Sequence, residues 1–163
     1  MTEEADFDKF KPYNESVIWQ ISDEYYQTKG IMAWSNKAPK IIPHKIGTNY
    51  QSAMALARLL KANLEQYPTV ERARVLECGA GSGRFSRNFL QAVQELGIAD
   101  KVTLLITDYS KHNLEEIQRK GILEGFSEGL EYKLLVLNII DDSVGLDLEG
   151  IIYVLDNIRI IFL

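Results

Sequence analysis

A glycine-rich turn between an apolar run and an amphipathic segment limits most strongly what this chain can fold into. Residues 74–78 (RVLEC) are typical of a short buried strand, and Gly79, Gly81 and Gly83 follow at alternate positions. One face of a helix comes next, marked by Phe85, Phe89, Leu90, Val93 and Leu96. Glycines at the carboxyl end of a strand let the chain turn tightly and let a ligand approach the backbone without meeting a Cβ atom. The turn therefore indicates a site for a nucleotide-like ligand.

The rest of the chain alternates between helical and strand-like patterns. We expect helices over 16–28, from Thr48 to Pro68, and from Ser110 to Gly121. Further strands are predicted over 101–107, 132–137, 150–154 and 159–163. The helix after Thr48 carries one apolar stripe, formed by Tyr50, Ala53, Met54, Ala57, Leu60 and Leu64. Unbroken apolar strands that alternate with helices predict an α/β fold, a Rossmann-like parallel sheet covered by helices on both faces.

The chain divides by pattern into two parts. Residues 1–47 mix acidic, aromatic and proline residues and are interpreted as a helical N-terminal extension, and residues 48–163 as the Rossmann-like domain. The sequence ends on the apolar run 159–163 (RIIFL), so the sheet is expected to stop, incomplete, after a fourth or fifth strand. An open sheet edge there would favour homodimer formation or aggregation.

Composition and charge exclude several classes of protein. The chain has 163 residues, one cysteine and two histidines, which exclude an internal disulfide and disfavour structural zinc or any other metal site. No apolar run approaches the ~18–20 residues of a membrane span, and the first residues are acidic, so we expect a cytoplasmic protein without a membrane segment. Residues 124–163 carry 8 acidic and 2 basic side chains, which disfavours nucleic acid as a partner.

The spacing of the glycines separates the ligand classes. A dinucleotide site needs G-x-G-x-x-G, but Arg84 stands three residues after Gly81 and the third glycine comes one position early. No G-K-[ST] follows, so a Walker A phosphate loop is absent. An NAD(P)-dependent oxidoreductase domain is thereby disfavoured but stays an alternative, as do a tight turn without a ligand and a non-catalytic interaction module.

The pattern E-x-G-x-G-x-G, from Glu77 to Gly83, resembles the first motif of the class I S-adenosylmethionine-dependent methyltransferases. The resemblance covers roughly residues 70–142 and implies S-adenosyl-L-methionine as the cofactor. In that family the glycines leave room for the methionine part, the acid at the position of Glu77 holds its amino group, and an acid after the second strand, here Asp108, accepts from both ribose hydroxyls. The bland alternative for Asp108 is an acid that favours a helix start.

Two further positions follow from the same resemblance. Tyr109 would flank the adenine, although an ordinary half-buried tyrosine explains it as well, and Asn138 would contact the adenine edge unless it is a turn residue. Asp141 and Asp142 are rivals for the role of Asn138. The start of the chain also resembles mitochondrial protein-arginine methyltransferases. The sequence names no catalytic base, and the methyl acceptor stays open, with a protein or small molecule favoured over RNA.

Overall fold

The computed structural model describes residues 17–30, 32, 48–126, 129–137, 151–156 and 160–162. Its elements, in chain order, are α1 (Val17–Lys29), α2 (Tyr50–Gln66), β1 (Ala73–Cys78), α3 (Arg84–Glu95), the 3-10 helix η4 (Ala99–Lys101), β2 (Val102–Asp108), α4 (Lys111–Arg119), β3 (Glu131–Val136), β4 (Ile151–Asp156) and β5 (Ile160–Phe162). Each helix and strand predicted from the sequence is present, with ends that differ by about one or two residues.

Local side chains explain where the helices begin. The Asn49 side chain accepts a hydrogen bond from the backbone N–H of Ser52 (2.8 Å) and so caps α2. Ser110 caps α4 as predicted, by accepting from the N–H of Asn113 at 3.4 Å. The predicted stripe of α2 is confirmed, since four of its members are buried: Ala53, Ala57, Leu60 and Leu64.

The strands form one sheet in the order β3-β2-β1-β4-β5. The pairs β1–β2, β1–β4 and β2–β3 are all parallel, so the carboxyl ends of four strands meet at one edge of the sheet. The first strand in the chain lies between the second and fourth, and this reversal of strand order is the switch point of a doubly wound, Rossmann-like sheet. The predicted α/β fold class is confirmed.

The last strand corrects the expectation of a wholly parallel sheet. Strand β5 pairs with β4 in the antiparallel sense, with Val154 opposite Ile161. Only the short segment 157–159 separates the two strands. A parallel return needs a crossover of a dozen or more residues, whereas an antiparallel hairpin closes with a few. The strand was recognised from its apolar residues, but its direction was set by the length of the connection.

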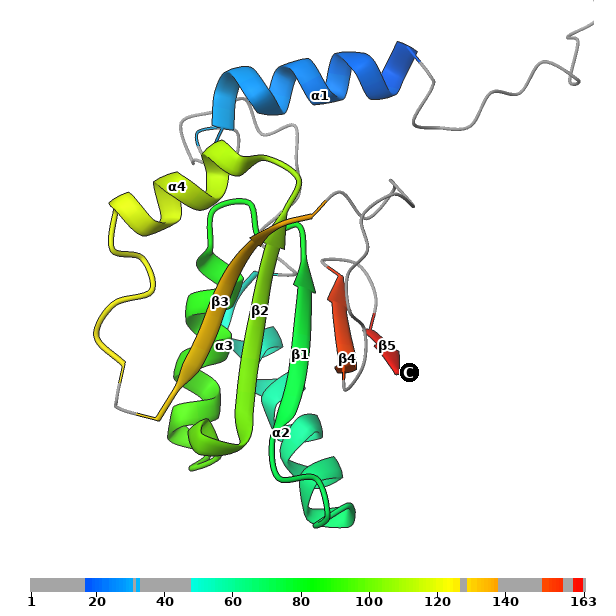
Figure 1. The fold of residues 1–163 in the computed structure, drawn as a ribbon, viewed down its shortest axis with the longest axis vertical. Helices are drawn as coiled ribbons and strands as arrows, with labels where there is room; N and C mark the ends of the chain where they lie inside the picture. Colours follow the sequence, from blue (N-terminus) through cyan, green and yellow to red (C-terminus); the bar gives the residue numbers. More distant parts are fainter. Residues whose placement is uncertain are drawn as a thin grey trace, which may run out of the picture.

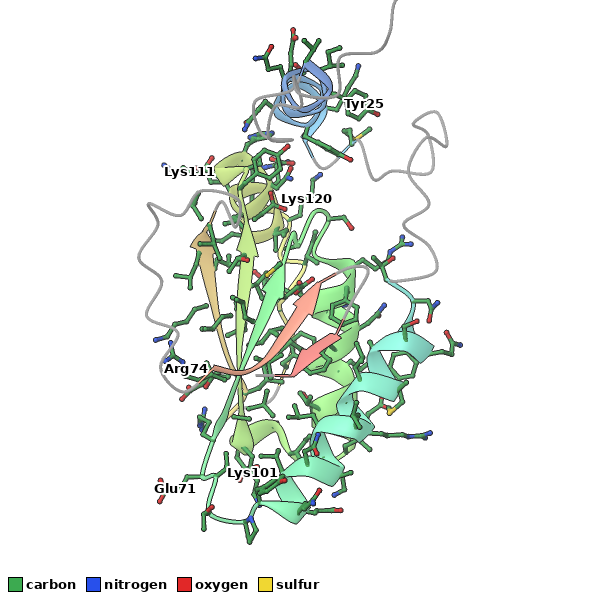
Figure 2. All side chains as sticks on the ribbon, turned by 90° about the vertical axis from the view of Figure 1, so that its right-hand side faces the viewer. Tyr25, Glu71, Arg74, Lys101, Lys111 and Lys120 are labelled. Atoms are coloured by element: carbon green, nitrogen blue, oxygen red, sulfur yellow. The ribbon has the colours of Figure 1, made fainter. Side chains whose placement is uncertain are left out.

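Two clusters of apolar side chains lie on opposite faces of the sheet. On the first face, α2, α3 and α4 pack over strand residues such as Val75, Leu104 and Ile106. Figure 2 shows α2 and α3 together on one side of the sheet. The second face carries a smaller cluster of Leu76, Cys78, Leu105 and Leu137. Cys78 is therefore the small buried residue that the sequence predicts. A layer of helices on this second face stays a prediction.

Helix α1 lies at the carboxyl edge of the sheet. In Figure 1 it crosses the end toward which β1, β2 and β4 point, next to α4. The extension thus reaches the edge at which parallel α/β sheets bind their ligands. The division of the chain at residue 47 stays a prediction.

Candidate ligand-binding site

The glycine turn and the end of β2 are bonded to each other at the carboxyl edge of the sheet. The backbone N–H of Ala80 donates to the carbonyl of Thr107 (2.8 Å), and that of Gly81 donates to Asp108 Oδ2 (2.8 Å). Thr107 Oγ1 in turn donates to the carbonyl of Glu77 at 2.7 Å. The structure therefore brings together the motif glycines, Glu77 and Asp108, as their order on alternating elements predicted.

Gly83 has a structural reason of its own. It precedes α3 with φ of +70°, in the left-handed region that favours glycine, and a Cβ there would lie 3.0–3.3 Å from the side chain of Ile117. Gly79 and Gly81 also have positive φ, of 74° and 53°. Gly83 thus allows the start of α3 to approach α4, whatever ligand the turn receives.

A Gly83→Ala variant should therefore lose stability even in the absence of any ligand. The left-handed conformation costs a residue with a Cβ about 1–2 kcal/mol, and the tight contact with Ile117 adds to this cost. Chemical denaturation monitored by circular dichroism would measure it. Gly125→Ala is the control, because Gly125 also has positive φ (+87°) but no atom lies within 4 Å of its added Cβ. Equal losses in the two variants would contradict the packing role of Gly83.

Asp108 is a buried carboxylate held by the backbone around it. It is the last residue of β2 and is 3% exposed. Besides the bond from Gly81, Oδ1 accepts from the N–H of Ser110 (2.9 Å) and from Asn113 Nδ2 (3.3 Å). Burial raises the pKa of Asp108, and the three N–H donors lower it in part.

Glu77 is buried more completely and is less well satisfied. It is 2% exposed, and Oε2 accepts a hydrogen bond from Ser86 Oγ at 2.6 Å. Its other oxygen, Oε1, is buried without a hydrogen-bond partner among the described residues. Burial raises the pKa of Glu77 to about 7, the bond from Ser86 opposes this rise, and the charge of Asp108 adds to it. A buried carboxylate oxygen without a donor is costly for the fold, so it indicates a position prepared for a donor from outside.

The site is acidic in the part of the chain that the structure describes. The ion pairs of the described residues involve neither Glu77 nor Asp108. Two buried carboxylates without a basic partner suit a ligand that carries a positive charge and hydroxyl groups, and they repel phosphates. This electrostatic arrangement disfavours a pyrophosphate at the turn.

The remaining predicted residues are divided between the described and undescribed parts. Tyr109 is half-buried directly after Asp108, and its ring meets the edge of Tyr26 from α1, with centroids 6.4 Å apart. Asn138 and its rivals Asp141 and Asp142 lie outside the described residues.

Sequence reasoning missed two residues of the site, Ser86 and Asn113. Both are buried and donate to the carboxylates, and both lie in the first turn of a helix. A small polar residue in the first turn after a glycine loop or after a strand-end acid is the signal that could have found them.

Two classes of feature were searched for in the described residues. No group of three or more histidine, cysteine, aspartate or glutamate side chains gathers there in a way that could hold a metal ion. No helix in that part of the chain is long and apolar enough to cross a membrane.

Comparison with known proteins adds one structure. No protein-family model matches the sequence, and no curated protein matches it. The chain is similar to the crystal structure of a "likely methyl transferase" from Burkholderia thailandensis bound to S-adenosyl-homocysteine, with 26% sequence identity and a TM-score of 0.41. The similarity covers 55% of this chain and 22% of that one.

Proposed function

We propose that this chain binds S-adenosyl-L-methionine at the turn after β1 and belongs to a methyltransferase. The observation that carries the proposal is the pair of buried carboxylates beside the glycine turn, one of which leaves an oxygen without a donor. S-adenosyl-L-methionine offers an ammonium group and a vicinal diol, which are the donors that such a pair lacks. The order of Glu77, Gly79, Gly81, Gly83 and Asp108 supports the same cofactor through its resemblance to the class I motif.

The acceptor capacity of each carboxylate assigns the roles. Glu77 Oε1 would accept from the ammonium group, and Ser86 holds the other oxygen in place. A carboxylate has about four acceptor positions, of which Asp108 uses three, so one hydroxyl can be accepted directly. The second hydroxyl would replace Asn113, whose bond to Asp108 is the longest of the three at 3.3 Å. Tyr109, and Asn138 beyond the described residues, would lie against the adenine.

The bound cofactor supplies a methyl group that is already electrophilic on its sulfonium. The work left to the protein is to exclude water and to align the acceptor with the methyl–sulfur bond. A protein side chain or a small molecule is proposed as the acceptor. No residue described here is assigned as a base.

Calorimetric titration with S-adenosylhomocysteine tests the proposal and has a predicted pH dependence. The ammonium group requires ionised Glu77, and the raised pKa of about 7 means that this carboxyl must lose a proton below that pH. The affinity should therefore rise by up to about tenfold per pH unit below pH 7 and level off above it. Folded protein that shows no heat at millimolar ligand would refute the proposal, and binding of NADH in its place would favour the oxidoreductase alternative.

A further inference from the structure

The C-terminal end of α1 contacts the residues that follow Asp108. The ring of Tyr26 meets that of Tyr109 edge to face, at an angle of 83°, and Tyr25 packs on Tyr26 in the same way at 5.6 Å. Tyr109 is the neighbour of Asp108 in the chain, so this aromatic contact lies directly beside the proposed ribose site. Figure 2 places Tyr25 on α1 at the same end of the molecule as Lys111 of α4.

Gly30 fits this end of α1 to the first turn of α4. It is buried and has φ of +50°, and a Cβ on it would lie 2.7 Å from His112 Cδ2 and 3.1 Å from His112 Nε2. Real Cβ atoms do not approach other heavy atoms so closely, so only glycine permits the observed contact. The turn it touches includes Asn113, which donates to Asp108.

The other end of α1 has a different environment. Val17 and Ile21 are 67% and 63% exposed, although both are apolar. The contacts described for α1 with the sheet domain therefore gather near Tyr26 and Gly30. A helix held mainly at one end, over the edge that receives the ligand, can move without disturbing the core.

We propose that α1 is a cover for the cofactor site, held closed by the Tyr26–Tyr109 contact and by the fit of Gly30 against His112. The proposal rests on the proposed function, because it needs a ligand at Asp108. In the closed position the helix hinders departure of the ligand, so Tyr26 and Gly30 act as positioning residues that touch Tyr109 and α4. Their loss should change the rate of ligand release more than the rate of binding.

Gly30→Ala tests the cover, with Gly97→Ala as its matched control. Both glycines follow a helix with positive φ (+50° and +67°), so alanine strains the backbone in both. An added Cβ at Gly97 has no atom within 4 Å, and Gly97 lies just before η4, at the opposite edge of the sheet near the labelled Lys101 (Figure 2). Stopped-flow measurement with S-adenosylhomocysteine should show release about three- to tenfold faster in Gly30→Ala, the worth of one aromatic contact, and unchanged in Gly97→Ala.

A double variant separates the cover from a general loss of structure. Replacing His112 by Ala in the Gly30→Ala background removes the ring that the new Cβ would meet, so release should return to the rate of the Gly97→Ala control. Tyr26→Ala should accelerate release to the same extent as Gly30→Ala. Equal release rates in Gly30→Ala and Gly97→Ala would overturn the cover while leaving the proposed function intact. Absence of binding in the wild-type protein would instead refute the proposed function.

Discussion

A Glu77→Gln variant is expected to be more stable than the wild type at pH 8 and to bind S-adenosylhomocysteine about ten- to 100-fold more weakly. Burial raises the pKa of Glu77 from 4.5 to about 7, so between these values the folded protein keeps a proton that the unfolded chain has lost. This stabilisation is complete below about pH 4.5 and disappears as the pH rises through about 7. At pH 8 the wild type buries a charge that the amide does not, a difference of up to about 3 kcal/mol.

The loss of affinity has a separate cause. Glutamine keeps an oxygen that can accept from Ser86 Oγ, but it cannot offer a charge to an ammonium group, and such a charge-assisted bond is worth about 1.5–3 kcal/mol. Urea denaturation and calorimetry at pH 5.5 and 8 measure the two effects. Glu71→Gln is the control, because Glu71 is exposed. A variant that lost stability at pH 8 and kept its affinity would assign Glu77 to the fold rather than to a ligand.

An Asp108→Asn variant should bind S-adenosylhomocysteine at least about 100-fold more weakly. The diol would lose two hydrogen bonds to a charged acceptor, each worth about 1.5–3 kcal/mol. The variant should also unfold more easily by about 1–3 kcal/mol, because the N–H groups of Gly81 and Ser110 then compete for one amide oxygen and one of them is left buried without an acceptor. The measurements are calorimetry and thermal unfolding.

The same substitution at Asp100 is the matched control for Asp108→Asn. Asp100 is exposed in η4, at the start of β2, whereas Asp108 ends that strand. Asp100→Asn should leave both affinity and stability unchanged. The binding role of Asp108 fails if its variant, folded at the temperature of the titration, retains wild-type affinity.

Much of the fold follows from local patterns. The apolar run of β1, the glycine turn and the stripe of α3 place a strand, a turn and a helix in order, because each pattern depends on residues close in the chain. The cap at Ser110 is equally local, and it places α4 directly after Asp108. The meeting of the turn with Asp108 followed once the strands were taken as parallel neighbours, since parallel strands bring their carboxyl ends to one edge.

Other features depend on contacts that no local pattern contains. The direction of β5 depends on the short connection after β4, and the donors of Ser86 and Asn113 to the carboxylates depend on how α3 and α4 rest on the sheet. The contact between Tyr26 and Tyr109 joins residues far apart in the sequence. Aromatic residues in the N-terminal extension gave no sign of which surface they would meet.

The sequence by itself determined the elements, the fold class and the residues of the glycine motif, because strand and helix periodicity and the steric freedom of glycine are local properties. Only the tertiary structure decided the state of those residues. Burial raises the pKa of Glu77 to about 7 and leaves its Oε1 without a donor among the described residues, and the fit of Gly30 against His112 sets α1 beside the site. Desolvation and close approach are properties of atoms brought together by folding, so they become visible only when the elements are packed.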